Sequence, residues 1–169
     1  MTDAIAPQQT AADQQADAPR PFNIMCKPAC GDCNLDCEYC YYTMKKNELY
    51  PDVEKPRMSV ETLETYTRQY CQAQPQQATF GWQGGEPTLM GLDFFKKAVE
   101  FQKQYRQPGQ TIENALQTNG TLLDDEWCDF LAAEKFLVGI SIDGPPQWHD
   151  SFRKDHAGNA SFHKAWAGL

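Results

Sequence analysis

A dense group of cysteines in residues 25–42, which read MCKPACGDCNLDCEYCYY, constrains this chain more than any other feature. Five of the seven cysteines in the sequence fall there. The last three have the spacing C-x-x-x-C-x-x-C, and an aromatic residue directly precedes the final cysteine. Three thiolates at this spacing can bind three irons of a 4Fe–4S cluster, which leaves the fourth iron open to another ligand. The five residues are Cys26, Cys30, Cys33, Cys37 and Cys40.

Two other interpretations of these cysteines remain open from their spacing. Cys30, Cys33, Cys37 and Cys40 also read C-x2-C-x3-C-x2-C, which can close a tetrahedral zinc site. Disulfide bonds are disfavoured, because so many adjacent cysteines suit a metal better than a scaffold and no secretion signal is visible. Clustered cysteines without such a signal indicate a reducing compartment, most simply the cytoplasm.

The rest of the composition indicates a globular protein of about one domain. The chain has 169 residues, of which 41% are apolar and 12% aromatic, enough to form a buried core. Its net charge of -8 argues against general binding to nucleic acid or to an anionic membrane. No apolar run has the length that spans a bilayer. Residues 1–20 are rich in Ala, Gln, Asp and Pro, so we expect a disordered tail there and one domain over residues 21–169.

Predicted strands and helices alternate along the chain, which indicates βαβ units and a parallel sheet. The predicted strands are residues 22–26, 78–82, 111–117 and 136–142. The main predicted helices are 60–71, capped by Ser59, 92–105, one opened by Asp124 or Asp125, and a last one capped by Asn159 or Ser161. A short helix is also expected at residues 41–46, and a polar loop between the fourth strand and the last helix.

An unusual segment lies at the end of each predicted strand. In chain order these segments are the cysteine loop (residues 27–42), GGEP (84–87), TNG (118–120) and SIDGP (141–145). Because the carboxyl ends of parallel strands lie at one edge of a sheet, these four motifs are expected to converge on one mouth. The backbone at Gly84 and Gly85 can approach a ligand closely, and Glu86 adds a carboxylate that can hold a cationic amino group. Ser141 is expected to face this mouth, where Arg153 can bind a carboxylate through two hydrogen bonds.

Several residues also have simpler interpretations. Arg153 by itself reads as a surface arginine beside Asp150 and Asp155, and Asn119 reads as a turn residue before Gly120. The roles of two cysteines outside the triplet, Cys26 and Cys30, stay open. Within the predicted helices and loops, we expect buried packing for Cys71 and Cys128, a loop position for His149, and a helix-surface position for His163.

Four segments together carry a resemblance to a known family. They read KPxxxxCNLDCEYCYY, WQGGEPTLMG, QTNGTLLDDEW and VGISIDGPPQWHDSFR. The cysteine motif and GGEP resemble the radical S-adenosylmethionine (SAM) enzymes as a superfamily. The last two segments narrow the resemblance to the anaerobic sulfatase-maturating enzymes, over about residues 22–169.

This resemblance implies a fold and a set of site residues. The implied fold is α/β, the N-terminal part of a partial (β/α)6 TIM-like radical SAM barrel with about four β/α units present. The implied ligands of a 4Fe–4S cluster are Cys33, Cys37 and Cys40. The residues implied to contact SAM are Tyr39, Gly85, Glu86, Ser141 and Arg153, and those implied to approach the target side chain are Tyr42 and Gln83.

The implied reaction uses a 5′-deoxyadenosyl radical to oxidise an active-site Cys or Ser of a sulfatase to Cα-formylglycine. An electron donor such as a flavodoxin or ferredoxin is implied as a partner. No catalytic residue is identified, because the base of the family is expected beyond Leu169, and we expect the sequence to be the N-terminal part of a longer enzyme that is inactive without the remainder. The alternatives are a radical SAM modifier of another peptide, an inactive fragment, or a non-catalytic zinc-binding module.

Overall fold

The computed structural model describes residues 21–42, 45, 48, 51–52, 56–74 and 76–169. Strands and helices alternate along these residues, as the sequence predicts. The tail expected at residues 1–20 lies outside the described residues, as does much of the helix expected at 41–46. Among the helices that the structure describes, none combines the length and the apolar character needed to cross a membrane.

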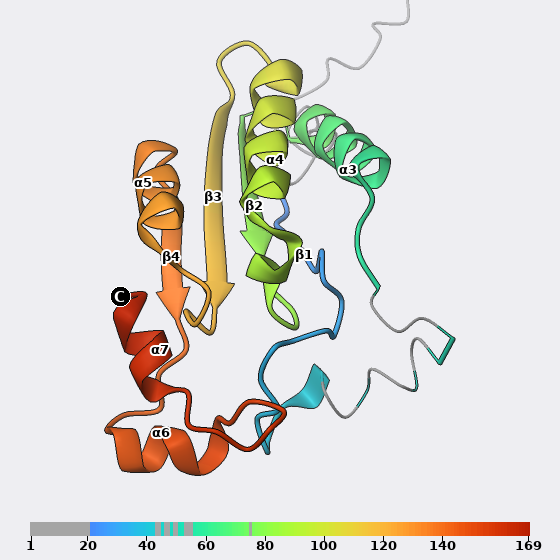
Figure 1. Ribbon diagram of the computed structural model, residues 1–169. Coiled ribbons are helices and arrows are strands. Elements are labelled where there is room, and N and C mark those ends of the chain that lie inside the picture. Colours follow the sequence, from blue (N-terminus) through green and yellow to red (C-terminus); the bar gives the residue numbers. More distant parts are fainter. Residues whose placement is uncertain (1–20, 43–44, 46–47, 49–50, 53–55, 75) are drawn as a thin grey trace, which may run out of the picture.

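Four parallel strands form one sheet in the order β1-β2-β3-β4. Their bounds are β1 Ile24–Cys26, β2 Gln77–Trp82, β3 Thr111–Thr118 and β4 Leu137–Ile140. All four point the same way, so their carboxyl ends lie at the lower edge of the sheet in Figure 1. The predicted strands are confirmed, although β1 and β4 are shorter than expected.

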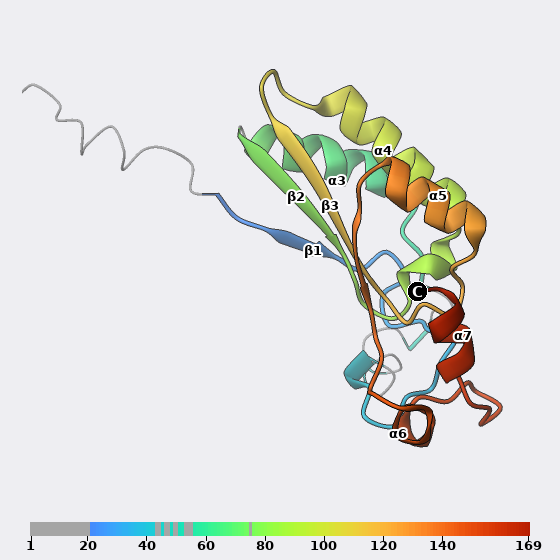
Figure 2. The same ribbon diagram turned by 90° about the vertical axis from the view of Figure 1, so that its left-hand side faces the viewer.

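Three helices cover one face of this sheet: α3 (Val60–Ala73), α4 (Leu92–Tyr105) and α5 (Asp125–Ala133), as Figure 2 shows from the side. The first and third of them begin at side-chain caps. Ser59 Oγ accepts the N–H of Thr62 at 3.1 Å, and Asp124 Oδ1 accepts the N–H of Trp127 at 3.0 Å. Both caps and the bounds of α4 agree with the sequence prediction.

The core lies between the sheet and these helices. Along β2, the side chains of Ala78, Phe80 and Trp82 point toward the helices and are fully buried. Phe95 of α4 packs against the ring of Trp82, with ring centroids 5.5 Å apart, and against Trp127 of α5 at 5.3 Å. Aromatic side chains therefore join the sheet to two of its covering helices.

The segment after β4 differs from its prediction, because the expected polar loop contains a helix, α6 (Pro146–Phe152). Its two large apolar residues, Trp148 and Phe152, are exposed and its buried residue is the polar His149, so an apolar pattern facing the core does not mark this helix. Pro146 suits the first turn, where the missing N–H of proline has no helical partner to lose. The expectation that His149 lies in a loop was therefore wrong.

The last helix, α7 (Phe162–Ala167), begins after Ser161 as expected, but the Ser161 side chain does not cap it. The Ser161 hydroxyl donates instead to the carbonyl of Arg153 at 2.7 Å. Asp150 Oδ1 takes the capping role by accepting the N–H groups of Ser161 at 3.0 Å and Phe162 at 2.8 Å. The start of α7 is thus tied to α6 and to the residue that follows it.

Three helix residues test the expectations about packing. Cys71 of α3 is fully buried and His163 of α7 is exposed, as expected. Cys128 of α5 is exposed, so its predicted burial was wrong. This helix turns Trp127 and Leu131 toward the core, which leaves Cys128 on the outside.

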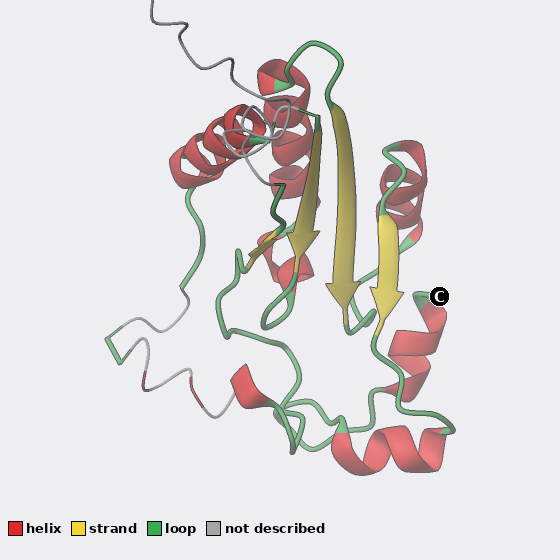
Figure 3. Cartoon of the chain, turned by 180° about the vertical axis from the view of Figure 1, so that it is seen from behind, coloured by secondary structure: helices red, strands yellow, loops and turns green. Residues whose placement is uncertain are grey.

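No described helix covers the opposite face of the sheet, which faces the viewer in Figure 3. An open cavity of about 530 Å³ lies on it, lined by residues of all four strands and by Gln83, which follows β2. Two apolar side chains of this face, Met25 and Leu137, are 56% and 74% exposed.

We predict that Phe95→Ala lowers the free energy of unfolding by about 3–5 kcal/mol, because it removes a fully buried ring and leaves a cavity. Leu137→Ala on the open face is the control, for which we expect a change within about 0.5 kcal/mol. Urea denaturation followed by circular dichroism measures both. Equal losses in the two variants would contradict this placement of the core.

Candidate functional site

The motifs that follow the strands meet at the carboxyl edge of the sheet, as the sequence predicts. The GGE segment reaches the cysteine loop through a hydrogen bond from the Glu86 N–H to the Asp32 carbonyl at 2.8 Å. The SIDGP segment joins the end of β3 through the Ser141 N–H and the Thr118 carbonyl at 2.9 Å. Helices α6 and α7 lie beyond this edge in Figure 1.

The cysteine loop is also held from its other side, by the chain between α6 and α7. The Asp36 N–H donates to the Lys154 carbonyl at 2.7 Å. The imidazole Nε2 of His156 lies 2.9 Å from the Cys33 carbonyl oxygen. The loop is therefore fixed between the GGE segment and a part of the chain more than a hundred residues later.

Two glycines allow the GGE segment to pack directly on the cysteine loop. Gly85 has a φ of +54°, and a Cβ there would collide with the Asp32 carbonyl. Gly84 has a φ of +90°, and a Cβ there would press against the Lys27 side chain. Both positions therefore require glycine, and at Gly85 the close approach is to the backbone of the loop.

Glu86 is buried, and its carboxylate accepts four hydrogen bonds from the protein itself. Oε1 accepts from the Thr88 N–H at 3.0 Å, the Thr88 hydroxyl at 2.6 Å and the Thr118 hydroxyl at 2.7 Å. Oε2 accepts from the Asn119 N–H at 2.7 Å. Glu86 also precedes the short 3₁₀ helix η1 (Pro87–Met90), so its carboxylate connects that helix to the end of β3.

The three cysteines of the C-x-x-x-C-x-x-C motif are partly buried free thiols. Burial raises the pKa of Cys33 to about 11, although hydrogen bonds from the Leu35 N–H and the Asn119 side chain oppose the rise. Burial also raises the pKa of Cys37, against the opposing charge of Arg153. Both groups are therefore protonated at neutral pH until a metal displaces the proton.

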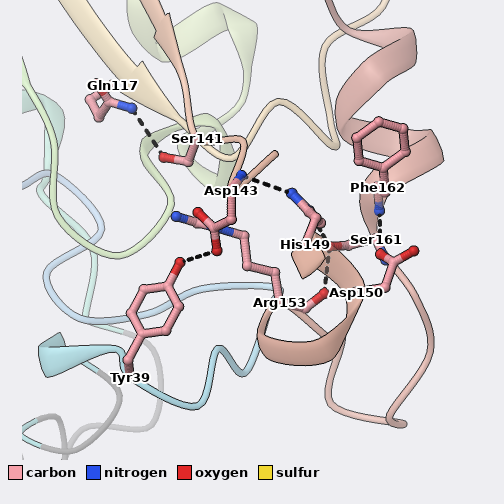
Figure 4. Close-up of polar contacts among 9 residues, drawn as sticks. All are labelled: Tyr39, Gln117, Ser141, Asp143, His149, Asp150, Arg153, Ser161 and Phe162. Atoms are coloured by element: carbon pink, nitrogen blue, oxygen red, sulfur yellow. Dashed lines mark hydrogen bonds and ion pairs between the residues drawn. The ribbon is translucent and has the colours of Figure 1, made fainter. Parts of the chain in front are cut away.

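Figure 4 shows Arg153, Asp143 and Tyr39 side by side at this site, with the Tyr39 hydroxyl bonded to Asp143. Arg153 Nε lies 3.0 Å from Asp143 Oδ1, and the Tyr39 hydroxyl donates to Asp143 Oδ2 at 2.5 Å. The guanidinium carbon lies 5.4 Å from the centroid of the Tyr39 ring. Arg153 therefore pairs with Asp143, and the interpretation as a surface arginine beside Asp150 and Asp155 was wrong.

The buried imidazole of His149 supports this arrangement from α6. Its Nδ1 accepts the Asp143 N–H at 3.4 Å, and its Nε2 lies 3.0 Å from the Ser161 hydroxyl. Because that hydroxyl donates to the Arg153 carbonyl, it accepts from His149 Nε2–H, which fixes the neutral tautomer. Burial and the charge of Arg153 lower the pKa of His149, which agrees with the neutral ring.

Three other residues expected at the mouth have local partners. Ser141 Oγ accepts from the Gln117 side chain at 3.0 Å. Gln83 lines the open cavity on the sheet. The ring of Tyr42 has Lys27 Nζ 5.0 Å from its centroid, and no hydrogen bond joins Tyr42 to Gln83 among the described residues.

Comparison with known proteins identifies the family. The sequence profile of the radical SAM superfamily matches residues 29–169. The chain belongs to the radical SAM superfamily. It is 48% identical over 151 residues to a serine-type anaerobic sulfatase-maturating enzyme of Bacteroides thetaiotaomicron, covering 89% of this chain and 36% of that enzyme. It is 41% identical over 145 residues to a cysteine-type enzyme of Clostridium perfringens, covering 85% of this chain and 39% of that enzyme.

Solved structures agree with this assignment and with the predicted partial barrel. Native anSMEcpe with bound AdoMet superposes with a TM-score of 0.80 at 41% identity, over 88% of this chain and 40% of that one. The same protein with bound AdoMet and the Cp18Cys peptide gives a TM-score of 0.79 at 40% identity, over 88% and 39% of the two chains. This radical SAM chain thus spans about two fifths of the length of these relatives.

The described side chains of the cysteine loop are not gathered around one point. Among the residues that the structure describes, no group of three or more Cys, His, Asp or Glu side chains lies close enough to hold one metal ion. The four-cysteine zinc site is therefore not assembled there.

Other site residues were missed from the sequence because only the fold reveals their partners. Asp143 and His149 support Arg153, and Arg57 forms an ion pair with Asp32 at 2.6 Å in the cysteine loop. For Asp143, the available signal was its position directly after the predicted strand 136–142. Cys26 lies in β1, where burial raises its pKa to about 12 and Cys30 adds to the rise.

We predict that Gly85→Ala destabilises the protein far more than Gly91→Ala. Both glycines have positive φ, so alanine at either position costs about 1–3 kcal/mol of backbone strain. A Cβ at Gly91 meets no atom within 4 Å, whereas at Gly85 it collides with the Asp32 backbone. Urea denaturation measures the difference, and similar losses in the two variants would contradict the close packing of GGE on the cysteine loop.

Proposed function

We propose that this chain forms the cluster- and SAM-binding part of an enzyme that oxidises an active-site Cys or Ser of a sulfatase to Cα-formylglycine. The observation that carries the proposal is the meeting of the cysteine loop, the GGE segment and Arg153 at one edge of the sheet. Support comes from the similarity to both serine-type and cysteine-type sulfatase-maturating enzymes. Residues 21–169 form the radical SAM domain in this proposal.

Cys33, Cys37 and Cys40 are the proposed ligands of a 4Fe–4S cluster. When bound, the cluster and SAM would supply the radical chemistry, through a 5′-deoxyadenosyl radical, that oxidises the target side chain. The fold contributes a loop that is fixed on both sides, so the three thiols stay at the mouth. The thiols release their protons when they bind iron.

The proposed SAM site lies between the cysteine loop and the strand ends. Arg153 binds the SAM carboxylate, because a guanidinium donates two parallel hydrogen bonds to such a group and its ion pair already fixes its position. Gly85 and Glu86 meet the SAM amino group through their backbone, since the Glu86 carboxylate is occupied by four donors. Ser141 lies at the polar end of SAM, and Tyr39 lies against it.

The proposed substrate is a sulfatase polypeptide that presents its Cys or Ser to the mouth of the barrel. Gln83 lines the open cavity of about 530 Å³, and together with Tyr42 it approaches the target side chain in this proposal. An electron donor such as a flavodoxin or ferredoxin supplies the reducing electron. The free cysteines of the described structure suit a reducing compartment such as the cytoplasm. The catalytic base is not assigned to a residue of this chain.

Electron paramagnetic resonance (EPR) tests the proposal on protein purified without oxygen, reconstituted with iron and sulfide, and reduced. We expect the signal of a 4Fe–4S cluster that changes when SAM is added. Cys37→Ala should lose the signal, whereas Cys128→Ala should retain it because Cys128 is an exposed cysteine of α5. A cluster signal that ignores SAM, or tightly held zinc without iron, would contradict the proposed function.

We also predict that Arg153→Met weakens SAM binding by about 10–100-fold, because a charged hydrogen-bond partner of the carboxylate is lost. Arg68→Met on α3 is the control and should bind SAM as the wild type does. Titration of the SAM-dependent EPR change measures the affinity. Equal affinities of the two variants would rule out the assignment of Arg153.

A further inference from the structure

Asn119 follows β3 in the TNG segment and is buried, with its backbone and its side-chain oxygen both fixed. Its N–H donates to Glu86 Oε2 at 2.7 Å. Its Oδ1 accepts the Thr121 N–H at 3.0 Å and the Thr121 hydroxyl at 2.8 Å. Because two donors face Oδ1, the orientation of the amide is determined, and the NH₂ group points the other way.

The NH₂ group of Asn119 points into the cysteine loop. Nδ2 donates to Asn34 Oδ1 at 2.8 Å and to Cys33 Sγ at 3.7 Å. The side chain of Asn34 completes a ring by donating from its own Nδ2 to the Thr121 hydroxyl at 2.8 Å. The sulfur of Cys33 also accepts the Leu35 N–H at 3.4 Å, so two N–H groups point at it.

A turn alone does not explain these contacts. The residue with positive φ in this turn is Gly120, at +75°, so Asn119 is not needed for a left-handed conformation. The turn uses only Oδ1 of Asn119, through Thr121. The turn therefore does not need the NH₂ group of the side chain, which makes its contacts in the cysteine loop instead.

The N–H groups directed at Cys33 affect how readily its sulfur carries negative charge. The Asn119 amide and the Leu35 N–H are both directed at Cys33 Sγ, and an N–H group in that position favours negative charge on the sulfur. Reduction adds an electron to an iron–sulfur cluster, and N–H groups directed at its sulfurs stabilise the more negative state. An amide donor at Cys33 therefore favours the reduced cluster.

We propose that Asn119 is a positioning residue for the cluster, whose N–H···S hydrogen bond to Cys33 raises the cluster reduction potential. This inference rests on the proposed function, because it needs a cluster bound to Cys33. It adds the TNG segment to the machinery that the cysteine loop, the GGE segment and Arg153 form.

A redox titration monitored by EPR tests the inference with two variants. Asn119→Ala removes the donor, so we expect a more negative midpoint potential than in the wild type. Thr121→Val removes a partner of Asn119 Oδ1 and of Asn34 but leaves the amide facing Cys33, so we expect a potential close to the wild-type value. An unchanged potential in Asn119→Ala, or equal shifts in both variants, would overturn the inference.

A second measurement does not depend on the stability of a variant. Pulsed electron–nuclear double resonance of the reduced wild-type cluster, in protein labelled with ¹⁵N-asparagine, should detect coupling to an asparagine side-chain nitrogen. Absence of that coupling would overturn the inference while the cluster itself, and the proposed function, remain. A wild-type protein that binds no cluster would contradict both together, so the two failures are distinguishable.

Discussion

The site depends on the hydrogen bonds that the buried carboxylate of Glu86 accepts. A buried charge is tolerated only when its hydrogen bonds are satisfied, and here Thr88, Thr118 and Asn119 supply all four donors. These donors come from η1 and from the end of β3, while the backbone of Glu86 bonds to the cysteine loop at Asp32. The segments after three strands are thereby held in one relative position.

The second support of the site comes from the far end of the chain. Asp143, which follows β4, binds both the Arg153 guanidinium and the Tyr39 hydroxyl of the cysteine loop. His149 fixes the backbone on either side of that pair, through Asp143 and through Ser161. The cysteine loop is therefore fixed between the segments that follow β2 and β3 and the segment that joins α6 to α7.

Periodicity, caps and strand-end motifs predicted most of the fold from the sequence. Ser59 and Asp124 mark helix starts by local chemistry, and the four strand ends converge because parallel strands share an edge. Local patterns did not predict α6, whose buried residue is the polar His149, or the outward side of α5 that carries Cys128. The sequence also did not predict that protein donors satisfy the Glu86 carboxylate. Some of these donors come from the end of β3, and only the packed structure brings them close to Glu86.

A crystal structure of the protein, reconstituted without oxygen and bound to SAM, tests the account most directly. The account predicts a cluster on Cys33, Cys37 and Cys40, with the SAM carboxylate on Arg153. It also predicts that the Glu86 carboxylate keeps its protein donors while backbone groups meet the SAM amino group. A metal bound through Cys30, or a Glu86 side chain turned away from β3 to hold SAM, would contradict it.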